Sequence, residues 1–216
     1  MRPVRRVGAY AIWLLSLLLV IGSGTQSRAQ FGSFASDANT IQVGRVAPAL
    51  KISTWINSPP LDLVQLFGKV VLIRFFSDNP TSAVALNEFY RTYKDQGFVI
   101  VGIYTPQPMP GTPDLDYVKR LALSVGFEFP IGIDGSWEVV NRYWLTDADA
   151  DMASAGFLID RKGVVRLVQG YGLYEKDSRN RTARREYEAL KQGIEALLQE
   201  EAPGGAAAST PPEPAQ

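Results

Sequence analysis

Two apolar runs separated by a helical pattern place the strongest constraint on the fold. Residues 70–76, VVLIRFF, form a nearly continuous apolar run, which is typical of a strand buried on both faces. Residues 98–104, FVIVGIY, form a second run of this kind. Between the two runs, large apolar side chains recur at helical spacing at Leu86, Phe89, Tyr90 and Tyr93. The order strand, helix, strand predicts an α/β fold.

The later elements continue this alternation with less regularity. The patterns predict further strands at 129–133, 155–159 and 164–168. Apolar spacing predicts further helices within 115–125, 137–144 and 187–198. Together these elements predict a central mixed β-sheet flanked by helices.

The helix after the first strand has a candidate start signal. Ser77, Asp78, Asn79 and Pro80 directly follow the strand. Asparagine is a favoured N-cap residue, and proline is favoured at the first helical position. We therefore predict that Asn79 caps this helix and that Pro80 begins it. A helix cap kept only for folding is one interpretation of these residues, and a ligand groove at the positive helix end is another.

The two ends of the chain differ from the predicted domain. Residues 1–29 contain three arginines within the first six positions, an apolar stretch and a small-residue cleavage pattern, which together predict a signal peptide. An uncleaved membrane anchor is the alternative. We expect a linker at 30–40, the folded domain at 41–200 and a disordered Ala/Pro-rich tail at 201–216. The expected location is exported, in a bacterial periplasm, with membrane contact only through an uncleaved N-terminal segment.

Charge and missing residue types exclude several classes of function. The chain has 22 basic and 22 acidic residues, and removal of residues 1–29 leaves 18 against 22, a net charge of −4. Such a balance argues against a nucleic-acid partner. The chain has no cysteine and no histidine. Thiolate chemistry, disulfides, zinc–thiolate sites and imidazole catalysis are therefore excluded, and we expect no cofactor.

Alternating aspartates at 147, 149 and 151 raise the question of a calcium site. An EF-hand loop that began there would need glycine at its sixth position and glutamate at its twelfth. The chain has Met152 and Leu158 at these positions. We therefore predict no metal site.

Several segments in the correct order resemble the thioredoxin-like redoxin superfamily. Within it, the similarity is to exported thiol-disulfide oxidoreductases, including the soluble domain of DipZ-type proteins, and more broadly to the alkyl hydroperoxide reductase/thiol-specific antioxidant group. The segments that carry the resemblance are 43–48, 68–73, 93–103, 141–144 and 157–163. The resemblance implies a thioredoxin-like fold over about residues 41–200.

The resemblance also implies a Cys-x-x-Cys motif after the first long strand, and this chain lacks it. Alignment by the proline sets Asn79, Pro80, Thr81 and Ser82 on the motif. An ungapped count instead sets Pro80 and Ala83 at the two cysteine positions. Both alignments remain open, and both remove the attacking and the resolving thiol that disulfide exchange requires.

A second departure concerns the cis-proline that the superfamily packs against its thiol pair. The matching position here is Ser154, and the preceding segment 145–153 looks like an insertion. Because cis peptide bonds are essentially a proline feature, we expect a differently shaped loop.

These observations lead to one principal hypothesis about function. We expect an exported, non-catalytic thioredoxin-like domain that binds a protein, a peptide or a small ligand, with no catalytic residue. The candidate groove comprises Asp78, Asn79, Pro80, Thr81, Ser82, Ala83, Trp144 and Ser154. One alternative is a thiol-independent enzyme with Asp78 as its best candidate residue, and another is a purely structural interaction module.

Overall fold

Six strands form one mixed sheet in the order β1-β4-β3-β2-β5-β6. The structure is a computed structural model that describes residues 43–143, 154–170 and 173–203, all within one unit, 36–216. The strands are β1 Trp55–Ile56, β2 Val70–Phe76, β3 Phe98–Tyr104, β4 Ile131–Ile133, β5 Gly156–Ile159 and β6 Val165–Gln169. The α-helices are α1 Ala83–Tyr93, α2 Leu115–Ser124, α3 Glu138–Tyr143 and α4 Arg181–Gln199. Short 3-10 helices are η1 Leu63–Leu66 and η2 Lys94–Gln96.

The two apolar runs form the centre of the sheet. Strands β2 and β3 are parallel along their whole length, and β3 is parallel to β4. Strand β5 is antiparallel to β2, with Arg74 opposite Gly156, and β6 is antiparallel to β5. All seven residues of β2 are buried, as the apolar run predicts.

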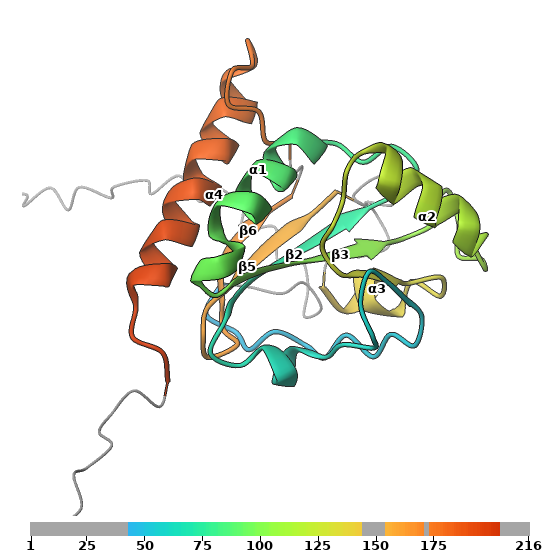
Figure 1. Cartoon of the computed structure of the whole chain (residues 1–216), viewed down its shortest axis with the longest axis horizontal. Helices are drawn as coiled ribbons and strands as arrows, with labels where there is room; N and C mark the ends of the chain where they lie inside the picture. The colour runs from blue at the N-terminus through green and yellow to red at the C-terminus, as the bar shows by residue number, and fades with distance from the viewer. Residues whose placement is uncertain (1–42, 144–153, 171–172, 204–216) are drawn as a thin grey trace, which may run out of the picture. The chain divides into compact units, whose positions relative to one another are not determined.

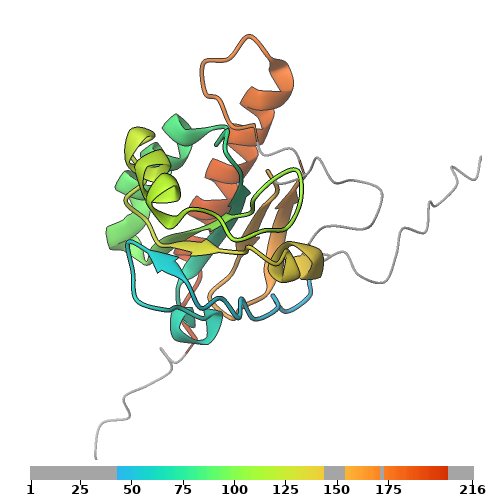
Figure 2. The ribbon, with the colours of Figure 1, turned by 90° about the vertical axis from the view of Figure 1, so that its right-hand side faces the viewer.

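Helices cover both faces of this sheet (Figures 1 and 2). Helices α1, α2 and α4 contribute to the apolar cluster on one face, where Phe89 of α1 stacks on Tyr187 of α4 with ring centroids 4.9 Å apart. Helix α3 and residues 47–52 contribute to the cluster on the other face. Successive residues of β2 alternate between the two clusters, so Ile73 and Phe75 face α3.

The predicted α/β fold, with a mixed sheet flanked by helices, is confirmed. The predicted start of the first helix is wrong: α1 begins at Ala83, and its N-cap is Ser82 rather than Asn79. Strand β1 was not predicted, because two residues are too short to show a periodic pattern.

Several sequence predictions lie outside the described residues. These are the signal peptide 1–29, the linker 30–40, most of the tail, the aspartates at 147–151 and Trp144. None of the helices within the described ranges is long and apolar enough to cross a membrane.

Candidate functional site

The turn between β2 and α1, residues 77–82, is held by polar contacts to three other elements. Its residues Asp78 and Asn79 are exposed, and the following residues are partly buried. Ser82 adopts a left-handed conformation, with φ 65° and ψ 20°, and its side chain does not cap α1. The cap preference of Asn79 is therefore overridden by contacts that residues on either side of it make with the rest of the fold.

Asp78 connects the turn to the end of β3. The Tyr104 hydroxyl donates to Asp78 Oδ1 at 2.5 Å. Burial and this carboxylate raise the pKa of Tyr104 well above its usual range. Desolvation and the charge of Asp78 also raise the pKa of Tyr117, on α2. Asp78 is thus engaged by neighbouring phenols, which both stay protonated at neutral pH.

A buried arginine lies beneath the turn. Arg74 of β2 is 1% exposed and belongs to the same face of the sheet as α1. Its Nη2 donates to Thr81 Oγ1 at 3.0 Å, and its guanidinium carbon lies 5.0 Å from the centre of the Tyr174 ring. A cation over an aromatic face is an attractive arrangement that gains strength where water is excluded. Arg74 therefore links the turn to the segment before α4.

Ser82 and Tyr174 form a second link between the same two segments. The backbone N–H of Tyr174 donates to Ser82 Oγ at 2.6 Å. The Tyr174 hydroxyl lies so close above Gly156 that a β-carbon at that position would collide with it. Burial raises the pKa of Tyr174, while Arg74 opposes that shift. We call Arg74, Thr81, Ser82 and Tyr174 the polar clasp.

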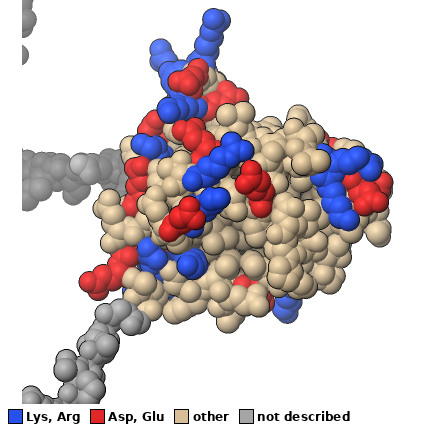
Figure 3. Space-filling model, in the orientation of Figure 1, with Lys and Arg blue, Asp and Glu red and all other residues tan. Residues whose placement is uncertain are grey.

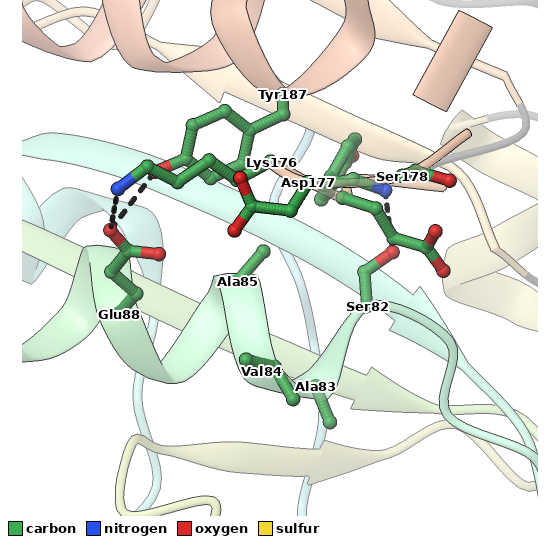
Figure 4. A pocket seen from close by; sticks show the side chains of 11 residues that line it. Ser82, Ala83, Val84, Ala85, Glu88, Lys176, Asp177, Ser178 and Tyr187 are labelled. Atoms are coloured by element: carbon green, nitrogen blue, oxygen red, sulfur yellow. Dashed lines mark hydrogen bonds and ion pairs between the residues drawn. The ribbon is translucent and has the colours of Figure 1, made fainter. Parts of the chain in front are cut away.

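A cavity of about 510 Å³ lies on the outer side of this clasp. It is lined by residues 82–85 and Glu88, by residues 174–178, and by Tyr187. Figure 4 shows Glu88, Lys176 and Tyr187 together at one end and Ser82 toward the other. We call this cavity the groove. Its walls come from α1, from the segment before α4, and from α4 itself.

Polar groups at the Glu88 end of the groove are already paired. Lys176 Nζ lies 3.5 Å from Glu88 Oε1, and the Tyr187 hydroxyl donates to the same oxygen at 3.1 Å. Burial and Glu88 raise the pKa of Tyr187 to about 12. The small and apolar side chains of Ala83, Val84 and Ala85 line the α1 wall.

Comparisons with known proteins agree with this architecture. No protein-family model matches the chain. The DipZ protein of Mycobacterium bovis is 33% identical over 163 residues, which cover 68% of this chain and 21% of DipZ. The thiol-disulfide oxidoreductase ResA of Bacillus anthracis is 26% identical over 153 residues, which cover 69% of this chain and 82% of ResA. The chain thus spans about a fifth of the length of DipZ.

A solved structure supports the same assignment. A putative protein disulfide isomerase from Bacteroides thetaiotaomicron matches with a TM-score of 0.57 and 25% identity, over 74% of this chain and 92% of that one. The chain belongs to the thioredoxin-like redoxin superfamily. In this thioredoxin-like chain, the positions aligned with the redox motif carry no sulfur under either alignment.

The thioredoxin-like fold brings only part of the predicted groove together. Of the candidate residues that the structure describes, Ser82 and Ala83 line the groove, and the others do not: Asp78, Asn79, Pro80, Thr81 and Ser154. Ser154 precedes β5, at the end of the sheet where β2 leads into the turn, because β5 is antiparallel to β2. Ser154 therefore lies at the same end of the sheet as the turn 77–82.

Sequence reasoning missed most of the groove wall opposite α1. Tyr174, Lys176 and Asp177 lie in a segment without periodic pattern, about ninety positions from Ser82. The signal that could have found them is the pair Leu173 and Tyr174 directly before the charged residues 175–177, since large apolar side chains at such a position imply packing against the fold. Within the described ranges, no cluster of His, Cys, Asp or Glu could hold a metal ion.

Proposed function

We propose that this protein is an exported, non-catalytic thioredoxin-like domain that binds an extended polypeptide segment in the groove between α1 and residues 174–178. The observation that carries the proposal is the use of Ser82. In both alignments Ser82 lies within the residues that match the redox motif of relatives, and here its side chain accepts a hydrogen bond from the opposite groove wall.

Loss of thiol chemistry supports a binding role. A chain without cysteine supplies neither the attacking nor the resolving thiol of disulfide exchange. The best remaining candidate for catalysis, Asp78, is engaged by the Tyr104 hydroxyl and does not line the groove. The polar clasp fixes the two walls relative to each other, and a preformed groove lowers the entropic cost of binding.

The α1 wall offers an apolar contact to a ligand. Val84 is 84% exposed and is one of the residues that line the groove, together with the smaller side chains of Ala83 and Ala85. Apolar contact area and a few fixed polar groups are the usual basis of peptide recognition. Export is proposed from the N-terminal sequence pattern alone.

Selection of phage-displayed random peptides on the purified domain tests the binding proposal. We expect enriched peptides that lose binding to the variant Val84→Arg, because a long charged side chain would fill the groove. Val64→Arg is the matched control, since Val64 is 82% exposed on η1 and lies outside the groove. Failure to enrich any peptide, or equal binding to both variants, would contradict the proposal.

A second assay tests the loss of catalysis. With dithiothreitol as the thiol donor, we expect the domain to leave the rate of insulin reduction at the level of the donor alone. A rate increase that depends on the concentration of the domain would overturn the non-catalytic assignment.

A further inference from the structure

Charge in the groove indicates what kind of polypeptide segment it receives. Three carboxylates line it, from Glu88, Glu175 and Asp177, against the single ammonium group of Lys176. Lys176 pairs with Glu88 at 3.5 Å. Among the residues that the structure describes, Glu175 and Asp177 form no ion pair. The groove itself therefore carries an excess of negative charge.

The position of these carboxylates suits a ligand in the groove. In Figure 4 the Asp177 carboxylate points toward Ala85, across the groove from its own segment. The Tyr187 side chain, which is 2% exposed and stacked on Phe89, lines the groove at its Glu88 end. Small side chains on the α1 wall leave space for the aliphatic part of a long basic side chain.

Basic residues near α4 do not cancel this charge inside the groove. Arg179, Arg181, Arg184 and Arg185 are exposed, and none of them lines the groove. The guanidinium of Arg184 donates to the Ser178 carbonyl oxygen. Figure 3 shows basic and acidic side chains interspersed over α1 and α4. A ligand inside the groove would therefore contact the lining carboxylates and Lys176, whereas the arginine side chains lie outside the lining.

We propose that the groove selects a polypeptide segment carrying a lysine or arginine side chain, which pairs with Glu175 and Asp177 while the neighbouring backbone lies along Val84. The inference rests on the proposed function, because it names the chemistry of the same ligand. It assigns a specificity role to two residues that lie outside the aligned redox motif.

Fluorescence anisotropy with defined peptide pools tests this specificity. The probes are fluorescein-labelled short peptides with one fixed central residue, Lys, Arg, Gln or Glu, flanked by randomised uncharged residues. We expect the Lys and Arg pools to bind about fivefold more tightly than the Gln pool, and the Glu pool to bind most weakly. This preference should shrink as salt rises from about 0.05 to 0.5 M.

A double variant assigns the preference to the two carboxylates. Glu175→Gln with Asp177→Asn should reduce the difference between the Lys and Gln pools to less than about twofold. The control, Glu200→Gln with Glu201→Gln, changes net charge equally at exposed positions outside the groove and should leave the difference intact.

The outcomes separate the two proposals. Equal binding of all pools, lost in Val84→Arg, would overturn the charge specificity and retain peptide binding. A preference for the Glu pool would also overturn it. Binding of no pool, or binding unaffected by Val84→Arg, would overturn the proposed function together with this inference.

Discussion

The two ends of α1 are attached to the fold by different physical means. At the C-terminal end, Phe89 stacks on Tyr187, and Tyr93 packs edge-on against Phe98. At the N-terminal end, Thr81 and Ser82 form hydrogen bonds with Arg74 and with the Tyr174 backbone. The first end is an apolar core, and the second is a polar clasp that joins two walls of the groove.

The difference shows which part of the chain specifies the fold and which part is free to specify function. The stability of the apolar end depends on the buried area and on the shapes of its side chains, because a close-packed interior leaves few voids. The clasp depends on particular donors and acceptors, whose net contribution to stability is about 1 kcal/mol each. Relatives with a redox motif and this cysteine-free chain can therefore share the apolar end and differ at the other.

Truncation of the apolar end should produce the largest loss of stability. Phe89→Ala removes a side chain that is 1% exposed and stacked between two tyrosines. We expect the free energy of unfolding to fall by about 3–5 kcal/mol. Urea denaturation measures the change, and a loss below about 1 kcal/mol would show that the apolar end does not anchor α1.

A β-carbon placed against the polar clasp should produce an intermediate loss of stability. A second substitution, which removes the clashing hydroxyl, should restore part of that stability. Gly156→Ala places a β-carbon against the Tyr174 hydroxyl and should lower the free energy of unfolding by about 1–3 kcal/mol. In the Tyr174→Phe background the hydroxyl is gone, and the next ring atom lies at an ordinary contact distance of 3.6 Å. A double-mutant cycle by urea denaturation should therefore show strong non-additivity. Additive losses would contradict the close packing of Tyr174 on β5.

Removal of one hydrogen bond from the polar clasp should lower the free energy of unfolding by less than the preceding substitutions do. Ser82→Ala leaves the Tyr174 N–H without its acceptor and should lower the free energy of unfolding by about 1–2 kcal/mol. Ser124→Ala is the control, because the Ser124 hydroxyl donates to a carbonyl oxygen at an exposed position, and its loss should change stability by less than about 0.5 kcal/mol. Equal effects of the two substitutions would mean that Ser82 does not hold the groove wall.

The same comparison explains how far the sequence could predict the structure. Phe89 and Tyr93 recur at helical spacing in one predicted helix, and Tyr187 begins the apolar pattern of another, so both apolar helix faces follow from the sequence. The prediction that Asn79 caps α1 is wrong because the cap preference of asparagine competes with long-range hydrogen bonds, such as that between Ser82 and Tyr174. The local sequence does not show these bonds.

The candidate site was predictable only on one side. Ser82 and Ala83 could be placed at the groove from the altered redox motif. The opposite wall, residues 174–178, has no repeat, and its approach to α1 depends on the buried Arg74 and on the small size of Gly156. The sequence shows that Arg74 lies within an apolar strand, but it does not show that Tyr174 is one of its contacts.

The smallest expected effect is a change in alkaline stability. Burial and Glu88 raise the pKa of Tyr187 from 10.0 to about 12, so the folded state favours the protonated phenol. Its contribution to stability is complete below about pH 10 and is lost as the pH rises through about 12. Tyr187→Phe should make the decline of unfolding free energy in this range shallower. Tyrosinate absorbance should lose one late-titrating phenol, and an unchanged titration would contradict the shift.

The central claim is that the groove beside the altered redox motif binds a polypeptide segment. The most direct measurement is a titration of the ¹⁵N-labelled domain with the lysine-fixed peptide pool, followed by amide chemical shifts. The account predicts saturable shifts concentrated in residues 82–88 and 174–187, and none of these in the Val84→Arg variant. Shifts confined to other parts of the domain, or no shift with any pool, would contradict it.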